Sequence, residues 1–234
     1  MPSKLYLIPS LLDENALATI PPSTVDAVMS CQVFFVENER TARRYLKKIS
    51  KNIVIDNYEW YTIDRDPVAT TAAFRKVVKE QKVIGIISEA GCPGVADPGQ
   101  ELVAIAHELG VEVKPVVGPS ALLLGLMASG MNGQGFRFAG YLPIREPERA
   151  KAIRDLEHDS ARNQSTQIFI ETPYRNHQLF SSLLTHCKAT TRLCIAADLT
   201  GPDEWVRTKT ILEWKKEELN LHKRPAIFLL LAGT

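Results

Sequence analysis

Long apolar runs, an excess of charge of one sign and closely spaced cysteines are all missing from this 234-residue sequence. Its longest apolar run, Ala121–Ala128, is far shorter than the ~18 residues that a membrane-spanning helix needs. Near the N-terminus only Leu5–Ile8 is apolar, which is too short for the apolar region of a signal peptide. The sequence therefore predicts a cytoplasmic protein without a membrane segment.

The charge balance and the cysteines further limit the class of protein that this sequence can encode. The 28 basic and 27 acidic residues leave a net charge of +1, so bulk charge favours neither nucleic acid nor an anionic membrane. The cysteines form no C-x-x-C pair, and reduced thiols are expected. With 45% apolar and 24% charged residues, the composition is that of a globular protein.

Several functional motifs are also absent. None of the 13 glycines precedes a lysine, so there is no phosphate-binding P-loop. The chain after the first apolar run, Pro9–Asp13, lacks the glycines of a dinucleotide-binding turn. Ser120 resembles the serine of a nucleophile elbow, but Leu122 occupies the place of the second glycine. No H-E-x-x-H motif and no Cys/His cluster with zinc spacing occurs, so we expect no metal.

Short apolar runs alternate with amphipathic stretches of helical length, which is typical of α/β proteins. In the first half, the runs predicted to be strands are Leu5–Ile8, Val33–Val36, Ile53–Ile55, Val83–Ser88 and Val111–Val117. The helices predicted between them are Ser23–Ser30, Glu39–Ser50, Pro67–Gln81 and Gln100–Leu109. This order predicts a doubly wound parallel sheet with right-handed crossovers.

The pattern changes after Gly118. Strands are predicted at Phe136–Tyr141, Gln167–Glu171, Arg192–Ala197, Trp205–Thr208 and Ile227–Ala232. Helices are predicted at Ala121–Ala128 and near Glu148–Glu157, Asn176–Cys187 and Ile211–Glu217. The last strands are close enough for antiparallel hairpins, so the sheet should be mixed. We therefore expect an N-terminal α/β domain over residues 1–117 and a C-terminal mixed α/β domain over residues 118–234, with a cleft between them.

The most informative segment runs from Val83 to Gly99, where a buried strand leads into a loop rich in glycine and proline. Ligands bind beyond the carboxyl ends of strands in open α/β sheets. Gly91, Gly94 and Gly99 can adopt a positive φ and let the backbone approach a ligand closely. A rigid structural turn is the competing explanation, but the position at a strand end favours a binding loop.

A second loop, Val116–Ala121, again joins a strand end to a helix. Ser120 could cap that helix, which is the ordinary role of such a serine, or offer its hydroxyl and backbone N–H to a polar ligand.

These segments resemble a known family. Ser88-Glu-Ala-Gly-Cys-Pro-Gly-Val-Ala-Asp-Pro-Gly99, Gly118-Pro-Ser-Ala-Leu122, Ala128-Ser-Gly130 and Phe136-Arg-Phe-Ala-Gly-Tyr-Leu-Pro143 are similar in order and spacing to the tetrapyrrole methylase superfamily. The similarity extends from residue 4 to residue 232. Within the superfamily it is greatest to the ribosomal RNA small-subunit methyltransferase I branch, whose members methylate a cytidine ribose 2′-hydroxyl.

The resemblance implies a two-lobed α/β homodimer that binds S-adenosylmethionine in the cleft between its lobes. Matched by position, the residues that would contact the cofactor are Leu11, Glu89, Ala90, Gly91, Val95, Ser120, Ala121, Glu171, Leu199, Pro225 and Ala226. The loop Glu89–Gly91, with Val95 behind it, would hold the methionine part and the ribose. Leu11, Ser120 and Ala121 would contact the same cofactor from neighbouring loops, and the later residues would enclose the adenine.

The sequence also departs from the branch. Its first loop, Leu11-Leu12-Asp13-Glu14, has no glycine, where the superfamily usually carries Gly-Asn or Gly-Asp. Glu37-Asn38-Glu39-Arg40 replaces Glu-Asp-Thr-Arg, Thr172-Pro173-Tyr174-Arg175 replaces Ser-Pro-His-Arg, and Ser88-Glu89 replaces Ser-Asp. The C-terminal extension of the branch is not present in the sequence. Most of these changes affect the substrate side, so the resemblance predicts the cofactor better than the acceptor.

One feature favours an RNA acceptor. Arg40, Arg43, Arg44, Lys47, Lys48 and Lys51 recur at steps of three and four residues, which places them on one helix face. Such a face could bind phosphates, with Arg40, Arg44, Lys47, Lys51 and also Arg175 on the substrate side. An ordinary solvated helix face would have the same pattern, and no aromatic-rich RNA-binding motif accompanies it.

Methyl transfer to a hydroxyl requires alignment of the acceptor and removal of its proton. The candidate catalytic residues are Glu37, Asp97, Glu171 and Arg175, which the sequence does not rank. Two alternatives remain open: a methyltransferase for a small or tetrapyrrole-like acceptor, and a non-catalytic regulatory protein that binds S-adenosylmethionine.

Overall fold

The computed structural model describes residues 3–63 and 66–233. The chain forms two compact units, Met1–Ser120 and Ala121–Thr234. The division falls three residues after the boundary predicted at residue 117. Whether each unit folds as an independent domain stays a prediction. Within the described residues, no helix is both long enough and apolar enough to cross a membrane.

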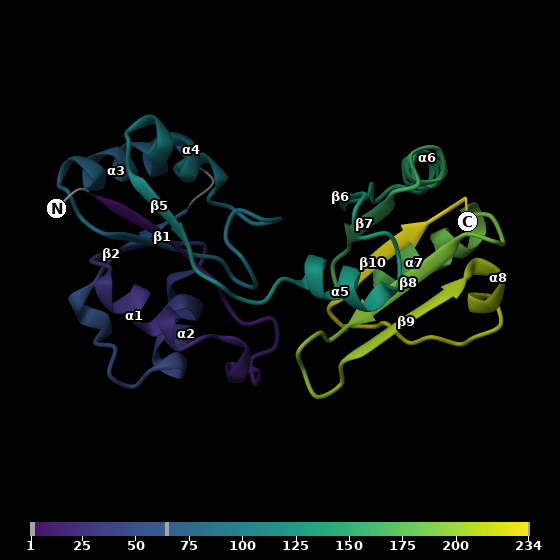
Figure 1. Ribbon diagram of the computed structural model, residues 1–234, viewed down its shortest axis with the longest axis horizontal. Helices are drawn as coiled ribbons and strands as arrows, with labels where there is room; N and C mark the ends of the chain where they lie inside the picture. The colour runs from purple at the N-terminus through teal and green to yellow at the C-terminus, as the bar shows by residue number, and fades with distance from the viewer. Residues whose placement is uncertain (1–2, 64–65, 234) are drawn as a thin grey trace. The chain divides into compact units, whose positions relative to one another are not determined.

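The first unit is a parallel five-stranded sheet covered by helices on both faces (Figure 1). Its strands are β1 (Lys4–Ile8), β2 (Val33–Val36), β3 (Glu59–Thr62), β4 (Ile84–Ile87) and β5 (Glu112–Pro115), in the order β3-β2-β4-β1-β5. Its α-helices are α1 (Ser23–Ser30), α2 (Glu39–Ile49), α3 (Pro67–Lys79) and α4 (Gln100–Glu108). This is the predicted doubly wound α/β architecture.

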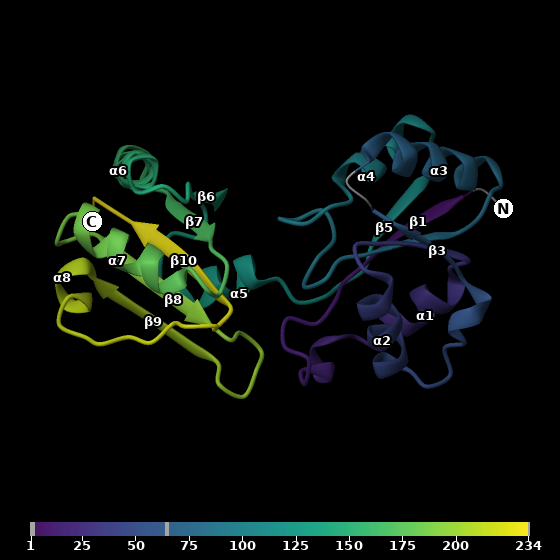
Figure 2. The same cartoon turned by 180° about the vertical axis from the view of Figure 1, so that it is seen from behind.

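The alternation of side chains along each strand builds two cores in this unit. On β2, Val33 and Phe35 pack with the residues of α3 and α4, whereas Phe34 and Val36 pack with those of α1 and α2. All four side chains are fully buried. Figures 1 and 2 show these helix pairs on opposite sides of the sheet. A strand buried on both faces must be apolar throughout, which is why its position was predictable.

The third strand is where the prediction was wrong. Ile53–Ile55 is not a strand, because Ile53 inserts into the core while Val54 is 51% exposed, and Ile55 begins a 3-10 helix, Ile55–Asn57. The third strand is instead β3, at one edge of the sheet, and it has no continuous apolar run. Its Trp60 and Tyr61 pair in register with Phe34 and Phe35, and the rings stack at 5.1 and 5.0 Å.

The second unit contains a mixed sheet in the order β6-β7-β10-β8-β9, in which only β6 and β7 are parallel. Its elements are α5 (Ala121–Ser129), β6 (Phe136–Tyr141), α6 (Glu146–Asn163), β7 (Thr166–Ile170), α7 (Asn176–His186), β8 (Arg192–Ala197), β9 (Trp205–Thr210), α8 (Ile211–Trp214) and β10 (Ala226–Leu231). The predicted antiparallel hairpin between β8 and β9 is confirmed.

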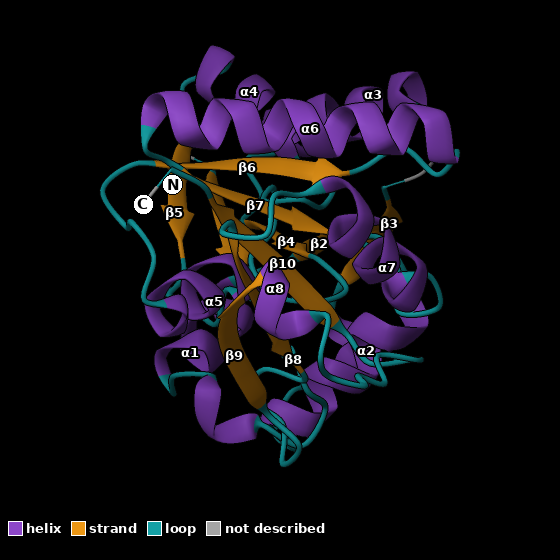
Figure 3. Cartoon of the chain, turned by 90° about the vertical axis from the view of Figure 1, so that its right-hand side faces the viewer, coloured by secondary structure: helices purple, strands orange, loops and turns teal. Residues whose placement is uncertain are grey.

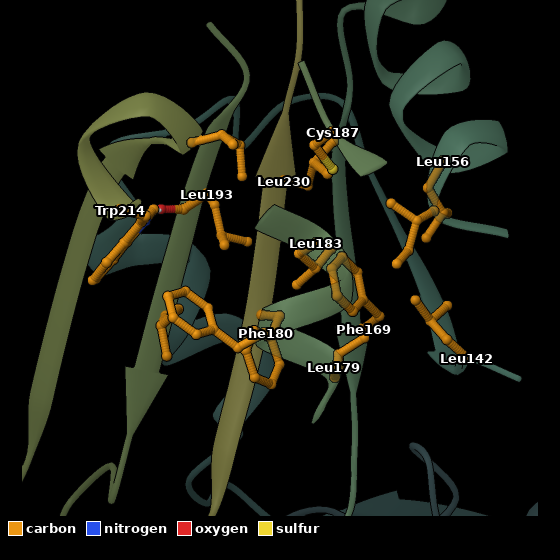
Figure 4. Packing of buried hydrophobic residues seen from close by; sticks show 14 of the residues in the cluster. Leu142, Leu156, Phe169, Leu179, Phe180, Leu183, Cys187, Leu193, Trp214 and Leu230 are labelled. Carbon is orange, nitrogen blue, oxygen red and sulfur yellow. Dashed lines mark hydrogen bonds between the residues drawn. The ribbon is translucent and has the colours of Figure 1, made fainter. Parts of the chain in front are cut away.

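The two faces of this second sheet are packed differently. On β10, Phe228 and Leu230 face the large core formed with α6, α7 and α8, which includes Phe180 and Trp214 (Figure 4). On the other face, α5 lies so close to β10 that a Cβ on Gly125 would come within 3.1 Å of Ile227 Cγ2. The long helix α6 runs beside β6 and β7 (Figure 3).

Two helices in this unit differ from the prediction in their bounds. The α6 helix extends beyond Glu148–Glu157 at both ends, because Pro147 lies in its first turn and Gln164, at φ 48°, ends it. The α8 helix is shorter than Ile211–Glu217 and ends at Trp214, whose indole N–H donates to Leu193 O at 2.8 Å.

Candidate functional site

The loops after β1 and β4 lie side by side at the carboxyl edge of the first sheet. Ser10 and Gly91 exchange backbone hydrogen bonds of 2.8 and 3.2 Å, and the Ser10 hydroxyl donates to Ser88 O at 2.6 Å. The connections after these strands pass over opposite faces of the sheet, since α1 follows β1 and α4 follows β4. Such a switch point is the usual ligand site of an open α/β sheet.

The three loop glycines have the predicted conformation. The φ angles of Gly91, Gly94 and Gly99 are +70°, +76° and +119°, all in the region that side chains disfavour. A Cβ on Gly91 would lie 3.4 Å from Leu12 and 3.5 Å from Pro119 O, so its absence keeps the space between two loops open. Leu11 is half-buried and Val95 is 46% exposed.

Three carboxylates gather beside this loop. Glu37, directly after β2, accepts a hydrogen bond of 3.1 Å from the Glu89 backbone N–H, and the Thr41 hydroxyl donates to the Glu89 carboxylate. Burial and, secondarily, the Glu37 carboxylate raise the pKa of Asp97 to about 6. Burial also raises the pKa of Glu37, against the opposing effect of the Glu89 N–H. Sequence reasoning named these acids but had no means of placing them together.

Replacing Asp97 with asparagine should stabilise the protein at neutral pH. The pKa of Asp97 is about 6 in the folded protein and ~3.9 in an unfolded chain, so the folded state binds the extra proton between these values. Stability should therefore fall as the pH rises through this window. In thermal denaturation, Asp97→Asn should raise the melting temperature at about pH 7.5, with a gain that shrinks toward about pH 4. Asp56→Asn, at an exposed acid, is the control. A gain independent of pH would contradict the assignment.

The predicted basic face lies on α2. Asn38 caps this helix by accepting from the N–H groups of Arg40 and Thr41 at 3.0 and 3.3 Å. Ala42, Tyr45 and Leu46 are buried against the sheet, which leaves the opposite face to the cations. All the basic side chains of this segment are exposed: Arg40, Arg43, Arg44, Lys47, Lys48 and Lys51. Of these, Arg43 pairs with Glu39 and lies 5.3 Å from the Trp60 ring centroid.

A cavity of about 260 Å³ lies between α2 and the two loops. It is lined by Ser10, Leu11, Leu12, Glu14, Thr41, Ala42, Arg44, Tyr45, Lys48, Ser88, Glu89 and Ala90. Three of the residues that the resemblance assigned to the cofactor, Leu11, Glu89 and Ala90, are among them. The cavity therefore connects the predicted cofactor loop with the basic helix face.

In the second unit, the residues assigned to the adenine lie along one edge of the sheet. Ile227 pairs with Ile170 and Ala226 with Ala197, so the residues that flank these strands on the same side are neighbours. They are Glu171 after β7, Leu199 after β8, and Pro225 with Ala226 at the start of β10.

A hydrogen-bond network that sequence reasoning missed ties these segments together. The buried Asn176 side chain donates to Arg224 O at 2.6 Å, and the Arg224 guanidinium pairs with Asp198. Asp198 N donates to Pro225 O at 2.9 Å. These residues come from three separate segments of the chain, and no motif in a single sequence marks them as partners.

Glu171 and Arg175 form an ion pair with each other. Arg175 Nη2 and the Thr172 N–H each donate to Glu171 Oε1 at 2.6 Å. Burial opposes ionisation of this acid, yet the hydrogen bonds from Arg175 and Thr172 hold the pKa of Glu171 below its ordinary value. Among the described residues, no group of three or more His, Cys, Asp or Glu side chains could hold a metal ion.

Comparison with known proteins identifies the family. The family model for tetrapyrrole (corrin/porphyrin) methylases matches residues 8–214. The chain is 26% identical over 229 residues to a ribosomal RNA small subunit methyltransferase I of Vibrio cholerae, covering 97% of this chain and 76% of that protein. It is 28% identical to the protein of the same name from Synechocystis sp., covering 84% and 67%. Uroporphyrin-III C-methyltransferase from Thermus thermophilus, complexed with S-adenosyl homocysteine, has a TM-score of 0.58 at 15% identity, covering 97% of each chain.

The family model and the sequence relatives thus show that the chain is a methyltransferase. More specifically, the chain belongs to the tetrapyrrole methylase family, whose methyl donor is S-adenosylmethionine. The predicted family, fold class, enzyme class and cofactor are confirmed.

Proposed function

We propose that this methyltransferase transfers a methyl group from S-adenosylmethionine to a ribose 2′-hydroxyl of small-subunit ribosomal RNA. The observation that carries the proposal is the exposed cationic face of α2 beside the acidic loops at the carboxyl edge of the first sheet. The names of the Vibrio cholerae and Synechocystis relatives support an RNA acceptor. A ribosomal substrate also agrees with the predicted cytoplasmic location.

The residues at this edge fit the cofactor. The sulfonium centre and the ammonium group of S-adenosylmethionine are cationic, and Glu37, Glu89 and Asp97 provide carboxylates around the loop. Glu89 and Ala90 are exposed, and the backbone of Gly91, which is bonded to Ser10, fixes the loop beside them. The proposed contacts in the first unit are Leu11, Glu89, Ala90, Gly91, Val95 and Ser120. Those in the second unit are Ala121, Glu171, Leu199, Pro225 and Ala226.

The candidate catalytic residues now separate into two groups. Glu37 and Asp97 have raised pKa values, and Asp97 is close to the value at which a carboxylate can accept a proton near neutral pH. We propose them as the candidates for removal of the hydroxyl proton. Glu171 and Arg175 are engaged with each other, so their proposed role is to shape the cofactor edge of the second unit. The bound cofactor would supply the electrophilic methyl group.

The basic face should determine how tightly RNA binds. Each phosphate that a cation neutralises releases counterions, so affinity depends on salt with a slope set by the number of contacts. Changing Arg44, Lys47 and Lys51 together to glutamine should weaken binding of small-subunit ribosomal RNA. The logarithmic salt slope should flatten by about two to three units, at ~0.7–0.9 per contact. Binding of S-adenosylmethionine, measured by titration calorimetry, should be unchanged.

A matched variant controls for the lost charge. Arg75, Lys76 and Lys79 lie on α3, and changing them to glutamine removes the same charge from a different helix. This control should keep the parent salt slope. If both triple variants bind RNA alike, the α2 face is only a solvated surface. That result would favour a small or tetrapyrrole-like acceptor over RNA.

Methyl transfer tests the acceptor itself. With tritiated S-adenosylmethionine, small ribosomal subunits should become labelled, whereas a uroporphyrinogen-type tetrapyrrole should not. Label in the tetrapyrrole alone would overturn the RNA proposal. The predicted homodimer is part of the same proposal, and sedimentation of the purified chain tests it.

A further inference from the structure

We infer that the cavity between α2 and the loops after β1 and β4 is the pocket for the acceptor nucleotide. It would hold one unstacked nucleotide, with a phosphate on Arg44 and Lys48 at its rim. The inference rests on the proposed RNA acceptor and goes further, because it separates the two cations that reach the acceptor from those that bind RNA elsewhere.

The inner wall of the cavity is rigid. Tyr45, which is buried, donates its hydroxyl to Pro9 O at 2.6 Å, and the Ser10 hydroxyl is committed to Ser88 O at the same distance. Ala42 is buried between the helix and the sheet. Leu11 and Leu12 form a half-buried apolar side. A wall of this kind, with its hydroxyls already bonded, suits the face of a nucleobase or ribose better than a strongly hydrated ion.

The rim carries two cations, and the acidic residues Glu14 and Glu89 also line the cavity. Arg44 and Lys48 are one helical turn apart, and both line the cavity. Neither forms an ion pair among the described residues. Outside α2, carboxylates neutralise most cations within the described ranges of this unit: Lys4, Arg75, Lys76, Lys82 and Lys114. Unpaired cations are thus concentrated on α2, where they are available to bind a phosphate.

The opposite wall belongs to the proposed cofactor loop. Glu89 and Ala90 line the cavity, and Glu89 is held by the Thr41 hydroxyl and the Glu37 carboxylate. A hydroxyl bound here would therefore lie beside the loop proposed to hold the methyl donor, with the Glu89 carboxylate in the cavity wall. A base stacked inside a duplex could not enter, so the acceptor must be presented as an unstacked nucleotide.

The test compares two double variants with a short single-stranded probe, the cytidine trinucleotide CpCpC. Arg44→Gln with Lys48→Gln removes the rim cations. Lys76→Gln with Lys79→Gln removes the same charge from α3, outside both the cavity and the basic face. The rim variant should bind the trinucleotide about tenfold more weakly, because two charge-assisted contacts are lost. The control variant should differ from the parent by less than about twofold, and both should keep their S-adenosylmethionine affinity.

Three outcomes would overturn the inference. If both variants weaken trinucleotide binding equally, the trinucleotide responds only to the overall positive charge of the protein and not to the cavity. Loss of S-adenosylmethionine binding in the rim variant would assign the cavity to the cofactor. A parent enzyme that methylates ribosomal RNA yet ignores the trinucleotide would refute the pocket while leaving the proposed function intact. Failure of the parent enzyme to methylate any RNA would instead refute the proposed function.

Discussion

Changing Gly91 to valine should weaken S-adenosylmethionine binding at least tenfold, equivalent to about 1.4 kcal/mol or more. Valine would place a branched side chain in the space between Leu12 and Pro119 O, beside the loop proposed to bind the cofactor. It would also occupy a φ of +70°, at a cost of roughly 1–2 kcal/mol. That cost is below the ~5–15 kcal/mol stability of an ordinary domain, so the fold should persist. Titration calorimetry measures the affinity, and circular dichroism checks the fold.

Gly110 provides a matched control for the backbone strain. Its φ is +68°, a Cβ there would meet nothing within 4 Å, and it lies before β5 rather than at the carboxyl edge of the sheet. Gly110→Val should lower the melting temperature much as Gly91→Val does, yet bind the cofactor normally. If the two variants bind the cofactor equally well, the β4 loop is not part of the site.

Replacing Gly118 with alanine should damage stability and cofactor binding together. The new Cβ would lie 2.2 Å from Pro9 Cβ and 2.3 Å from Pro9 Cγ, so one of the two loops has to move. Pro9 is buried, and its carbonyl holds the Tyr45 hydroxyl. Overpacking of this kind costs typically ~1–3 kcal/mol. Chemical denaturation should show that loss, and displacement of the Ser10–Leu12 loop should weaken S-adenosylmethionine binding several-fold.

Gly133→Ala is the appropriate control because a Cβ at Gly133 would meet nothing within 4 Å. The same added methyl group should leave stability unchanged or raise it slightly, since alanine restricts the unfolded chain. Parent-like stability in Gly118→Ala would show that the Pro9 loop is free to relax, and the two loops would then not form a fixed site.

Elements buried on both faces could be predicted from the sequence, and partly exposed elements could not. β2 was predicted with its true ends because all four of its side chains must be apolar. β3 was missed because its stability comes from Trp60 and Tyr61 stacking on β2, a contact between segments far apart in the sequence. The Ile53–Ile55 run has the residues of a strand but packs as an irregular segment and a 3-10 turn.

The candidate site shows the same limit. The glycine-rich loop after β4 was predictable because glycine and proline act on the local backbone, and its positive φ angles are confirmed. By contrast, the cluster of Glu37, Glu89 and Asp97 depends on which strands are neighbours. The pairing of Arg224 with Asp198 depends in addition on the irregular segments of the second unit. The spacing of residues along one sequence reveals neither the order of the strands nor the path of these irregular segments.

The position of the transferred methyl group on the RNA decides whether the acceptor is a ribose 2′-hydroxyl. Small ribosomal subunits are incubated with the enzyme and tritiated S-adenosylmethionine, and the recovered RNA is hydrolysed with alkali. Hydrolysis needs a free 2′-hydroxyl as the internal nucleophile, so a 2′-O-methylated ribose protects its own linkage. We expect the label in an alkali-stable dinucleotide. Label released with mononucleotides would place the methyl group on a base, and unlabelled RNA beside a labelled small molecule would contradict an RNA acceptor altogether.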